Sequence, residues 1–418
     1  MHSVGNDLVE IERIRKSMKN PRFCLRILGG MEYAQLAGRG FPAESVAASF
    51  CAKEAFSKAV GTGLSGFDLR EVQLLRAPSG RPELCFSGRA RELAGDREFS
   101  VSVTHTREYA SAVVVGDGSV FPDNPENEEI AAGLERVRAM LRPRDPESNK
   151  GNYGRLLCVC GSAGMAGAAV MSTRAAIRCG AGIVEAALSK AIYPIVAAQV
   201  CESVFTLLEL SGENELTSGG EESLKSALGR ASTVLIGCGL GKSAAARTLV
   251  SLILKNSSVP VILDADGINI VSENIDILKT VRVPLILTPH PGEMARLLKT
   301  DAAEVQKNRE TVAREFAKNR GVILVLKGAG TLVAAPDGRL FRNATGNPGM
   351  AKGGSGDVLA GMIASFAAQG IEPFEAASGA VFLHGLAGDR CARKFSMTAM
   401  LPTDLIDALP ELFREIGR

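Results

Sequence analysis

The sequence predicts an α/β protein in which a doubly wound, mostly parallel sheet forms the C-terminal part and a smaller α+β domain precedes it. Over residues 133–418, continuous apolar runs alternate with helical stretches, a rhythm typical of parallel strands buried on both faces and joined by helices. Residues 1–116 contain strands and helices without that rhythm. Between these parts, residues 117–132 are rich in turn formers and acids, which indicates a linker.

The composition of the 418-residue chain is that of a folded protein with two to four domains, since 46% of its residues are hydrophobic and 22% charged. This balance excludes a disordered chain and a small disulfide scaffold. The formal net charge is +2, so we expect neither nucleic acid nor a membrane as a partner. The nine cysteines lack zinc or redox spacing and no secretory signal opens the chain, which favours the cytoplasm.

Two segments of the N-terminal domain indicate its secondary structure. FSVSVTHT, residues 99–106, alternates apolar with polar side chains and predicts a half-buried strand. SVAASFCAKEAFSKAV, residues 45–60, is rich in alanine and contains neither glycine nor proline, which predicts a helix. Together they favour a compact α+β domain.

Apolar runs mark the strands of the C-terminal part: LLCVC, TVLIG, PVILDAD, PLILTPH and VILVLKG. Sheets of this kind bind ligands beyond the carboxyl ends of their strands. The residues that close the runs are therefore candidates for a binding site. They are Gly237, Asp264, Asp266, His290 and Lys327.

A glycine-rich loop, GNPGMAKGGSGD, leads from residue 346 into a strongly apolar helix. The start of such a helix offers free N–H groups and the positive end of the helix dipole, which suit a phosphate. Asp357 stands there as a carboxylate able to take a proton from a substrate hydroxyl during phosphoryl transfer. Alternatively, Asp357 only caps the helix and the glycines only permit tight packing.

Three further features of this part have competing interpretations. Residues 237–243, GCGLGKS, resemble a P-loop, but Ile236 occupies the place of its first glycine, so we expect only a glycine turn able to approach a ligand. His290 lies between two prolines that would hold its imidazole in place, unless the ring only satisfies turn backbone. Lys327 could neutralise a phosphate, or it is a solvated strand-end lysine.

Two carboxylates of the N-terminal domain, Asp7 and Glu54, come from distant segments and could hold one Mg²⁺. Glu54 also precedes Lys58 by one helical turn, so a plain salt bridge is the alternative. His105 falls on the apolar face of its strand, where a buried core histidine is an alternative to a ligand contact.

A basic segment follows the start of the chain and contains no acidic residue. On a helix it could bind an acidic protein partner, or it could be an ordinary solvated face. Its basic residues are Arg13, Arg15, Lys16, Lys19, Arg22 and Arg26.

The C-terminal motifs GSAGMAGAA, GAGIVEAAL, LDADGIN, LTPHPGEMARLL, VLKGAGTLV and NPGMAKGGSGDVLAGM resemble, in this order, those of ADP-dependent NAD(P)H-hydrate dehydratases of the ribokinase-like superfamily. The resemblance implies that fold and dehydration of (6S)-NADHX or NADPHX to NADH or NADPH, with ADP converted to AMP and phosphate. It implies Asp357 as the catalytic residue. Nucleotide contacts are implied for Lys327, Gly328, Ala329, Gly330, Thr331 and Gly356. Contacts to the hydrated dinucleotide are implied for Ala181, Gly239, His290 and Asp357.

GNDLVEIERI, FCAKEAFSKAVGTG, PSGRPEL and VSVTHTREYASAVV resemble the holo-acyl-carrier-protein synthase family of phosphopantetheinyl transferases along residues 1–116. This implies transfer of 4′-phosphopantetheine from coenzyme A to a serine of acyl carrier protein, which would bind the basic segment. Asp7 and Glu54 then match Mg²⁺ ligands, and Glu54 and Lys58 are catalytic. Lys58 and His105 would contact coenzyme A. Family members form trimers, so we expect a homo-oligomer.

Three positions depart from these families: Cys238 replaces a usual proline, Asn149 a frequent histidine and Ser49 a common arginine. The first two remove no proposed catalytic group, whereas Ser49 would weaken a phosphate or subunit contact. We therefore expect a bifunctional enzyme that uses Mg²⁺, ADP and coenzyme A. The alternative is a ribokinase-like kinase of a small alcohol behind a non-catalytic trimerisation domain.

Overall fold

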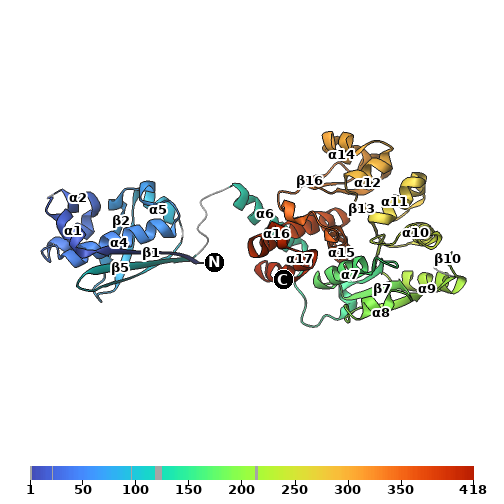
Figure 1. The fold of residues 1–418 in the computed structure, drawn as a ribbon, viewed down its shortest axis with the longest axis horizontal. Helices are drawn as coiled ribbons and strands as arrows, with labels where there is room; N and C mark the ends of the chain where they lie inside the picture. Colours follow the sequence, from blue (N-terminus) through green and yellow to red (C-terminus); the bar gives the residue numbers. More distant parts are fainter. Residues whose placement is uncertain (1, 21, 96, 118–124, 212–214) are drawn as a thin grey trace. The chain divides into compact units, whose positions relative to one another are not determined.

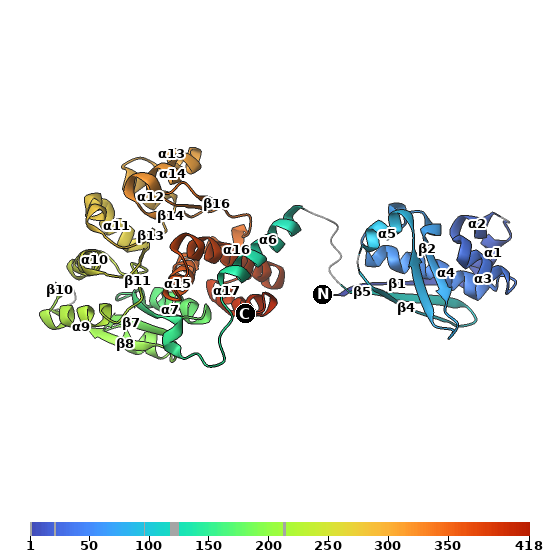
Figure 2. The same cartoon turned by 180° about the vertical axis from the view of Figure 1, so that it is seen from behind.

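The computed structural model describes residues 2–20, 22–95, 97–117, 125–211 and 215–418. The chain divides into two compact units, Met1–Glu128 and Glu129–Arg418. Figures 1 and 2 show their elements from opposite sides. Among the helices of the described ranges, none combines the length and the apolar character needed to cross a bilayer.

The N-terminal unit contains a three-stranded antiparallel sheet in the order β1 (His2–Glu10), β5 (Tyr109–Asp117), β4 (Phe99–His105). Helix α4 (Ala43–Ala59) packs across this sheet and forms the core with it. The predicted α+β architecture is confirmed. The remaining elements are a hairpin of β2 (Val72–Arg76) and β3 (Pro82–Phe86), the helices α1 (Ile11–Met18), α2 (Phe23–Ile27), α3 (Gly30–Ala37) and α5 (Gly88–Ala94), and the 3₁₀ turns η1 (Leu64–Gly66) and η2 (Leu69–Glu71).

Strand β1 and helix α4 approach one another closely at Gly5. A Cβ atom at this position would lie 2.0 Å from the Ala55 carbonyl oxygen and 2.6 Å from the Ala59 nitrogen, so only glycine fits. The approach brings Asp7, two residues further along β1, next to Glu54 in α4. A backbone contact thus assembles the predicted carboxylate pair.

The C-terminal unit is a nine-stranded sheet with helices on both faces, which confirms the doubly wound prediction. All five predicted apolar runs form adjacent parallel strands. The seven parallel strands lie in the order β14 (Ile323–Leu326), β13 (Leu285–Leu287), β12 (Val261–Leu263), β11 (Thr233–Ile236), β6 (Arg155–Val159), β7 (Ile183–Ser189) and β8 (Val204–Leu208). Antiparallel strands β15 (Leu332–Ala334) and β16 (Leu340–Arg342) extend the β14 edge, and β9 (Leu210–Ser211) pairs with β10 (Glu215–Leu216).

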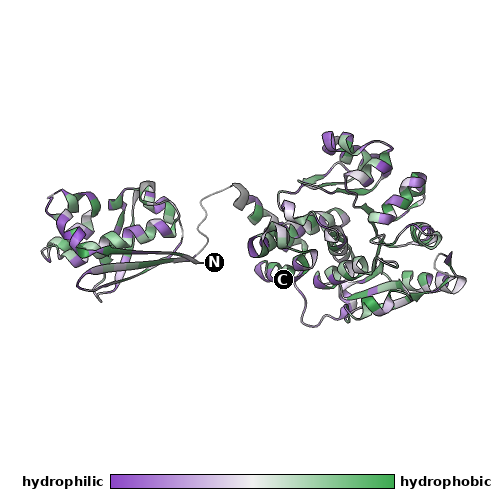
Figure 3. Cartoon of the chain, viewed as in Figure 1, coloured by the Kyte–Doolittle hydropathy of each residue, from purple (hydrophilic) through white to green (hydrophobic). Residues whose placement is uncertain are grey.

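Two helical layers enclose this sheet, and apolar residues concentrate where each layer meets it (Figure 3). One layer contains α6 (Pro125–Met140), α7 (Ala166–Arg178), α8 (Tyr193–Ala197), α15 (Ser355–Ala368), α16 (Pro373–Ala399) and α17 (Pro402–Glu415). The other contains α9 (Ser218–Leu228), α10 (Ala244–Asn256), α11 (Ala265–Glu273), α12 (Pro291–Leu298), α13 (Ala302–Lys307) and α14 (Arg309–Arg320). The 3₁₀ turns η3 (Lys150–Tyr153), η4 (Ile275–Thr280) and η5 (Pro348–Met350) complete the unit.

The segment expected to be a linker, residues 117–132, differs in part from that expectation. Residues 118–124 lie outside the described residues, and α6 begins at Pro125. Further along, α6 contributes Val137 to the core of the C-terminal unit. The first five residues of this helix, PENEE, include no apolar side chain beyond the proline, which is why the sequence pattern did not reveal its start.

Candidate active sites

The predicted carboxylate pair of the N-terminal unit lies where β1 meets α4. Burial and the neighbouring Asp7 charge raise the pKa of Glu54. Lys58 Nζ donates to Asp7 Oδ1 and to the Asn6 carbonyl, both at 2.9 Å. Among the ion pairs of the described residues, Lys58 therefore binds Asp7 and not Glu54. The interpretation as a plain helical salt bridge is wrong.

This pair is suited to a magnesium ion. Two adjacent carboxylates repel each other when both are ionised, and a divalent cation relieves that repulsion. Mg²⁺ commonly takes one or two carboxylates and completes its shell with water and substrate phosphates. Asp7 and Glu54 fit such a site, and half-exposed Lys58 offers a positive charge to the same phosphates.

His105 ends β4 and is exposed, so it is not a core histidine. The strand register pairs Asp7 with Ala112 and Ala112 with Val103, which places His105 on the same sheet face as Asp7. With ~4.8 Å between strands and ~3.4 Å per residue, the Cα atoms of His105 and Asp7 lie ~12 Å apart. An elongated ligand could span this distance.

The basic segment borders the same site. All six of its basic side chains are exposed on α1, on α2 or between them. The charge of Arg13 acts on Glu54 and favours its ionised form. A positive surface therefore lies next to the carboxylate pair, as binding of an acidic partner would require.

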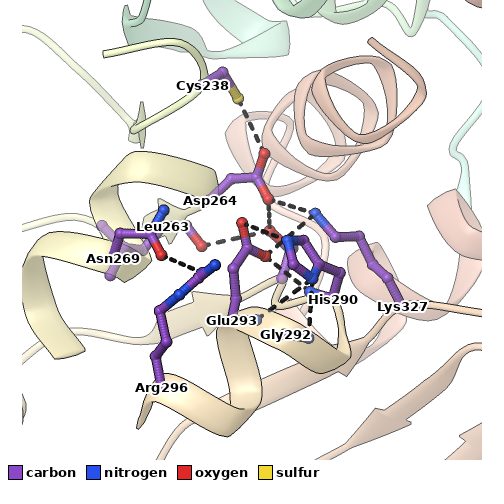
Figure 4. A network of polar contacts seen from close by, with 10 residues as sticks. Cys238, Leu263, Asp264, Asn269, His290, Gly292, Glu293, Arg296 and Lys327 are labelled. Atoms are coloured by element: carbon purple, nitrogen blue, oxygen red, sulfur yellow. Dashed lines mark hydrogen bonds and ion pairs between the residues drawn. The ribbon is translucent and has the colours of Figure 1, made fainter. Parts of the chain in front are cut away.

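In the C-terminal unit, charged side chains converge at the carboxyl ends of β12, β13 and β14 (Figure 4). Asp264 is buried, and its Oδ1 accepts from Lys327 Nζ at 2.8 Å and from Thr288 Oγ1 at 2.5 Å. Glu293 Oε2 lies 4.0 Å from the same ammonium group. Although burial opposes it, the charges of Asp264 and Glu293 raise the pKa of Lys327. Lys327 is only 17% exposed, so it is not a solvated strand-end lysine.

Asp357 faces this cluster from the first turn of α15. Burial and then the charge of Asp264 raise the pKa of Asp357 to about 6. The N-cap of α15 is Gly354, and no side chain caps this helix, so the capping interpretation of Asp357 is wrong. A carboxylate whose pKa lies near neutrality is suited to accept a proton during catalysis.

The start of α15 lies directly above Lys327. Gly354 adopts a φ of +105°, which favours glycine. A Cβ atom on Gly356 would lie 3.2 Å from Lys327 Nζ, so the ammonium group lies directly beneath the helix start. Arg309 braces the loop after β14 through the carbonyls of Leu326 and Lys327, at 2.9 and 3.1 Å. The helix start and a fixed cation thus face one another, while the Ser355 N–H is already bonded to the Lys352 carbonyl oxygen at 3.3 Å.

His290 is the N-cap of α12. Its Nδ1 accepts from the Gly292 N–H at 3.0 Å, and the His290 N–H donates to Glu293 Oε2 at 2.8 Å. The turn-capping interpretation is therefore confirmed. The imidazole remains half exposed in a fixed orientation, so it can also contact a ligand.

The glycine turn after β11 packs against the start of α7. A Cβ atom on Gly239 would lie 2.6 Å from Ala168 Cβ, and the φ of Gly239 is +58°. Ser243 caps α10 through the Ala246 N–H, so the turn does not form the phosphate loop that its sequence resembles. Beside it lies a cavity of about 270 Å³, lined in part by Ser162 and Ser243.

Comparison with known proteins assigns this unit to a family. Residues 156–411 match the sequence model of a family described as NAD(P)H-hydrate dehydratase. The chain belongs to this family. Residues 3–114 separately match the 4′-phosphopantetheinyl transferase superfamily.

Individual relatives support the assignment to the dehydratase family. A bifunctional NAD(P)H-hydrate repair enzyme of Moorella thermoacetica is 41% identical over 67% of this chain and 53% of its own length. An ADP-dependent (S)-NAD(P)H-hydrate dehydratase of Neisseria meningitidis is 40% identical over 61% of this chain and 82% of that protein. The solved ADP/ATP-dependent dehydratase of Bacillus subtilis has a TM-score of 0.58 and 32% identity, covering 68% of this chain and 97% of that one. The chain spans about half the length of the bifunctional relatives it matches.

One dinucleotide residue expected from the dehydratase resemblance lies elsewhere. Ala181 precedes β7, so it stands at the amino end of the parallel strands, and its N–H donates to Ser365 Oγ late in α15. His290, Gly239 and Asp357 lie at the opposite, carboxyl edge. Ala168, in the AGAA part of a motif already quoted, contacts the Gly239 turn instead.

Sequence reasoning gave no role to Asp264 beyond its strand-end position and did not single out Glu293. The signal for Glu293 was present, because an acid three residues after His290 is the pattern of a capping box. The three residues that depart from the family patterns have identifiable places in the fold. Asn149 caps η3, and Cys238 and Ser49 are buried.

Proposed function

We propose that the C-terminal unit is an ADP-dependent dehydratase that returns (6S)-NADHX or NADPHX to NADH or NADPH and releases AMP and phosphate. One observation carries the proposal. Asp357, with a pKa of about 6, faces the buried Asp264–Lys327 pair at a helix start that can hold phosphate. Membership of the dehydratase family supports the choice of substrate.

The chemistry follows from these groups. Water is a poor leaving group, so the hydroxyl of the hydrated ring is first phosphorylated. Asp357 takes the hydroxyl proton while the oxygen bonds to the β-phosphorus of ADP and the bridge to the α-phosphorus breaks, releasing AMP. Lys327 and the N–H groups of Gly354 and Gly356 stabilise the charge on the transferring group. Phosphate then departs with the carbon–oxygen electron pair, a ring proton is lost, and the double bond forms.

We propose that ADP and the hydrated dinucleotide bind at the carboxyl edge of the sheet. Lys327, Gly328, Ala329, Gly330, Thr331 and Gly356 would contact the nucleotide. Gly239, His290 and Asp357 would contact the hydrated dinucleotide. The nearby cavity of about 270 Å³ offers room for part of that molecule.

For the N-terminal unit, we propose Mg²⁺-dependent transfer of 4′-phosphopantetheine from coenzyme A to a serine of acyl carrier protein. Asp7 and Glu54 would hold the ion, which supplies charge neutralisation at the pyrophosphate when bound. Lys58 would bind the same phosphates, and His105 would line the far end of the coenzyme A site. The basic segment would receive the acidic carrier, and the units would associate into trimers. Free cysteines at all nine positions support a cytoplasmic setting.

The dehydratase proposal is tested by ADP-dependent recovery of NADH absorbance from (6S)-NADHX with wild-type protein and Asp357→Asn. Wild type should form AMP with NADH, and the variant should lose activity. The matched control is Asp276→Asn, an exposed aspartate paired with Lys279. Equal rates for wild type and Asp357→Asn would remove Asp357 from this role. ATP-dependent phosphorylation of a small alcohol with release of ADP would instead identify the kinase alternative.

The transferase proposal is tested by mass spectrometry of apo-acyl carrier protein after incubation with the full chain, coenzyme A and Mg²⁺. The carrier should gain the mass of phosphopantetheine, and Glu54→Gln should prevent this. An unchanged carrier mass with wild-type protein would favour a domain that only organises the oligomer.

A further inference from the structure

A cysteine and two aspartates converge at the dehydratase site from three different elements. Cys238 follows β11, Asp264 follows β12, and Asp357 lies in the first turn of α15. One ligand atom from each, the sulphur and two carboxylate oxygens, lie within 4.8 Å of one another. In the described part of the chain, no other three histidine, cysteine, aspartate or glutamate side chains meet in this way.

Cys238 Sγ donates a hydrogen bond to Asp264 Oδ2, and the spacing of these two atoms also suits two ligands of one zinc ion. Lys327 and Thr288 occupy Asp264 Oδ1, so Oδ2 is left facing Cys238 Sγ at 3.4 Å (Figure 4). A tetrahedral ion with Zn–S of about 2.3 Å and Zn–O of about 2.1 Å separates its sulphur and oxygen ligands by ~3.6 Å. The observed separation matches this value. A side-chain rotation of Asp357 would close the third contact.

The charge and the chemical type of these groups also suit a thiophilic cation. A thiolate and two carboxylates carry three negative charges and Lys327 carries one positive charge, so these four groups together leave two negative charges for a divalent cation, with Glu293 Oε2 4.0 Å from the Lys327 ammonium group. A sulphur donor favours Zn²⁺ or Cd²⁺ over Mg²⁺. A second thiol, that of Cys160, lies in hydrogen-bonding contact with Cys238 and provides another soft donor. Cys238 is fully buried, whereas Asp357 is partly exposed, so an ion would enter from the Asp357 side.

We propose that Cys238, Asp264 and Asp357 form a binding site for a thiophilic divalent cation such as Zn²⁺, and that the bound ion inhibits the dehydratase. On binding, the Cys238 thiol proton passes to water and a sulphur–metal bond forms, with no change of oxidation state. Asp357 becomes a metal ligand and no longer accepts the substrate proton. The inhibition rests on the proposed dehydratase function, whereas the binding rests on the geometry alone.

The binding is tested by calorimetric titration of the full, metal-free chain with Zn²⁺ alone. Wild type should bind one ion at this site, and Cys238→Ala should weaken that binding by more than the ~10–100-fold that loss of an outer-shell partner costs. The matched control is Cys179→Ala, another buried cysteine, which lies at the far end of α7 and should bind as wild type does. Both variants keep the exposed thiol of Cys201, so its contribution cancels. Equal binding by Cys238→Ala and wild type, or no binding by wild type, would overturn the proposal.

A spectroscopic arm identifies the ligand directly. With Cd²⁺ in place of Zn²⁺, a thiolate-to-metal charge-transfer band should develop at full intensity in wild type and Cys179→Ala and should be much weaker in Cys238→Ala, which keeps the thiols of Cys160 and Cys201. If Cys238→Ala fails to fold, Cys238→Ser serves under the same criterion, because a hydroxyl gives no such band. A band of full intensity in either Cys238 variant would refute the assignment.

An activity arm separates this proposal from the proposed function. Stoichiometric Zn²⁺ should inhibit ADP-dependent dehydration by wild type, a chelator should restore it, and Cys238→Ala should keep its own zinc-free rate when Zn²⁺ is added. Inhibition of that variant to the same extent as wild type would refute inhibition through this site. If the zinc-free wild type shows no dehydration, the proposed function fails, and the titration still decides whether the site exists.

Discussion

The Asp357→Asn substitution tests catalysis and stability at a single side chain. In the folded unit, burial and the Asp264 charge raise the pKa of Asp357 from 3.8 to about 6. Above that pH, the ionised carboxylate lies in an environment that disfavours it, and so it lowers the stability of the native state. Asparagine has nearly the same shape and no charge. We therefore expect the variant to lose activity and gain stability.

The size of the gain follows from the shift. One pKa unit corresponds to about 1.4 kcal/mol, so the change from 3.8 to about 6 amounts to ~3 kcal/mol. A carboxyl group whose pKa is higher in the folded than in the unfolded chain reduces stability as the pH rises between those two values. The stability that Asp357→Asn gains over wild type should thus be absent below about pH 4, grow up to about pH 6 and stay constant above that pH.

Calorimetric unfolding of the C-terminal unit at about pH 4 and about pH 7.5 measures the difference in stability between the variant and wild type. In a separate assay, the rate of ADP-dependent dehydration should fall by ~10²–10⁴ if Asp357 is the base. Asp276→Asn, at an exposed aspartate whose pKa is lowered by Lys279, is the control and should give no gain. An Asp357→Asn protein that is no more stable than wild type at pH 7.5, or equally stabilised at both pH values, would refute the reasoning.

Three other substitutions probe the remaining charges. Lys327→Met leaves buried Asp264 without its cation. The KM for ADP should therefore rise in steady-state assays, and calorimetry should show the C-terminal unit destabilised by ~3–5 kcal/mol. Lys53 and Glu32 form an ion pair in which both side chains are 0% exposed. Lys53→Met should lower the stability of the N-terminal unit by ~3–5 kcal/mol in urea unfolding. Adding Glu32→Leu to this variant should restore part of the lost stability. Arg13→Glu should raise the KM for acyl carrier protein several-fold and leave that for coenzyme A nearly unchanged, with the difference shrinking as salt is added.

The pattern of apolar residues along the chain was sufficient to predict the architecture of the C-terminal unit. The five apolar runs became five adjacent parallel strands, because each run is long and branched enough to be stable only when buried on both faces. The closing residues of β12, β13 and β14 reached one edge because parallel strands all end there. Ala181 lies at the other edge for the same reason: it precedes its strand, and residues before parallel strands collect at the amino end of the sheet.

The hydrogen-bond and ion-pair partners of individual side chains could not be predicted from the sequence pattern alone. Lys58 lies one helical turn from Glu54 yet binds Asp7, since the close approach at Gly5 brings β1 within reach of its long side chain. His290 was open to two interpretations until the position of the Gly292 N–H was known. The Lys58–Asp7 pair has no signature in residue spacing, whereas the acid three residues after His290 was a signal for the cap.

The sequence by itself determined the order of the elements and the glycine-rich helix start, and it indicated the carboxyl edge of the sheet for the proposed dehydratase site, because these features depend on neighbours along the chain. Only the tertiary structure decided that Asp264 pairs with Lys327 and faces both Cys238 and Asp357. These four residues are far apart in the sequence, and the strand order and the approach of α15 bring them together. The physical reason is that burial and charge, which raise the pKa of Asp357, are properties of the surrounding space and not of the local sequence.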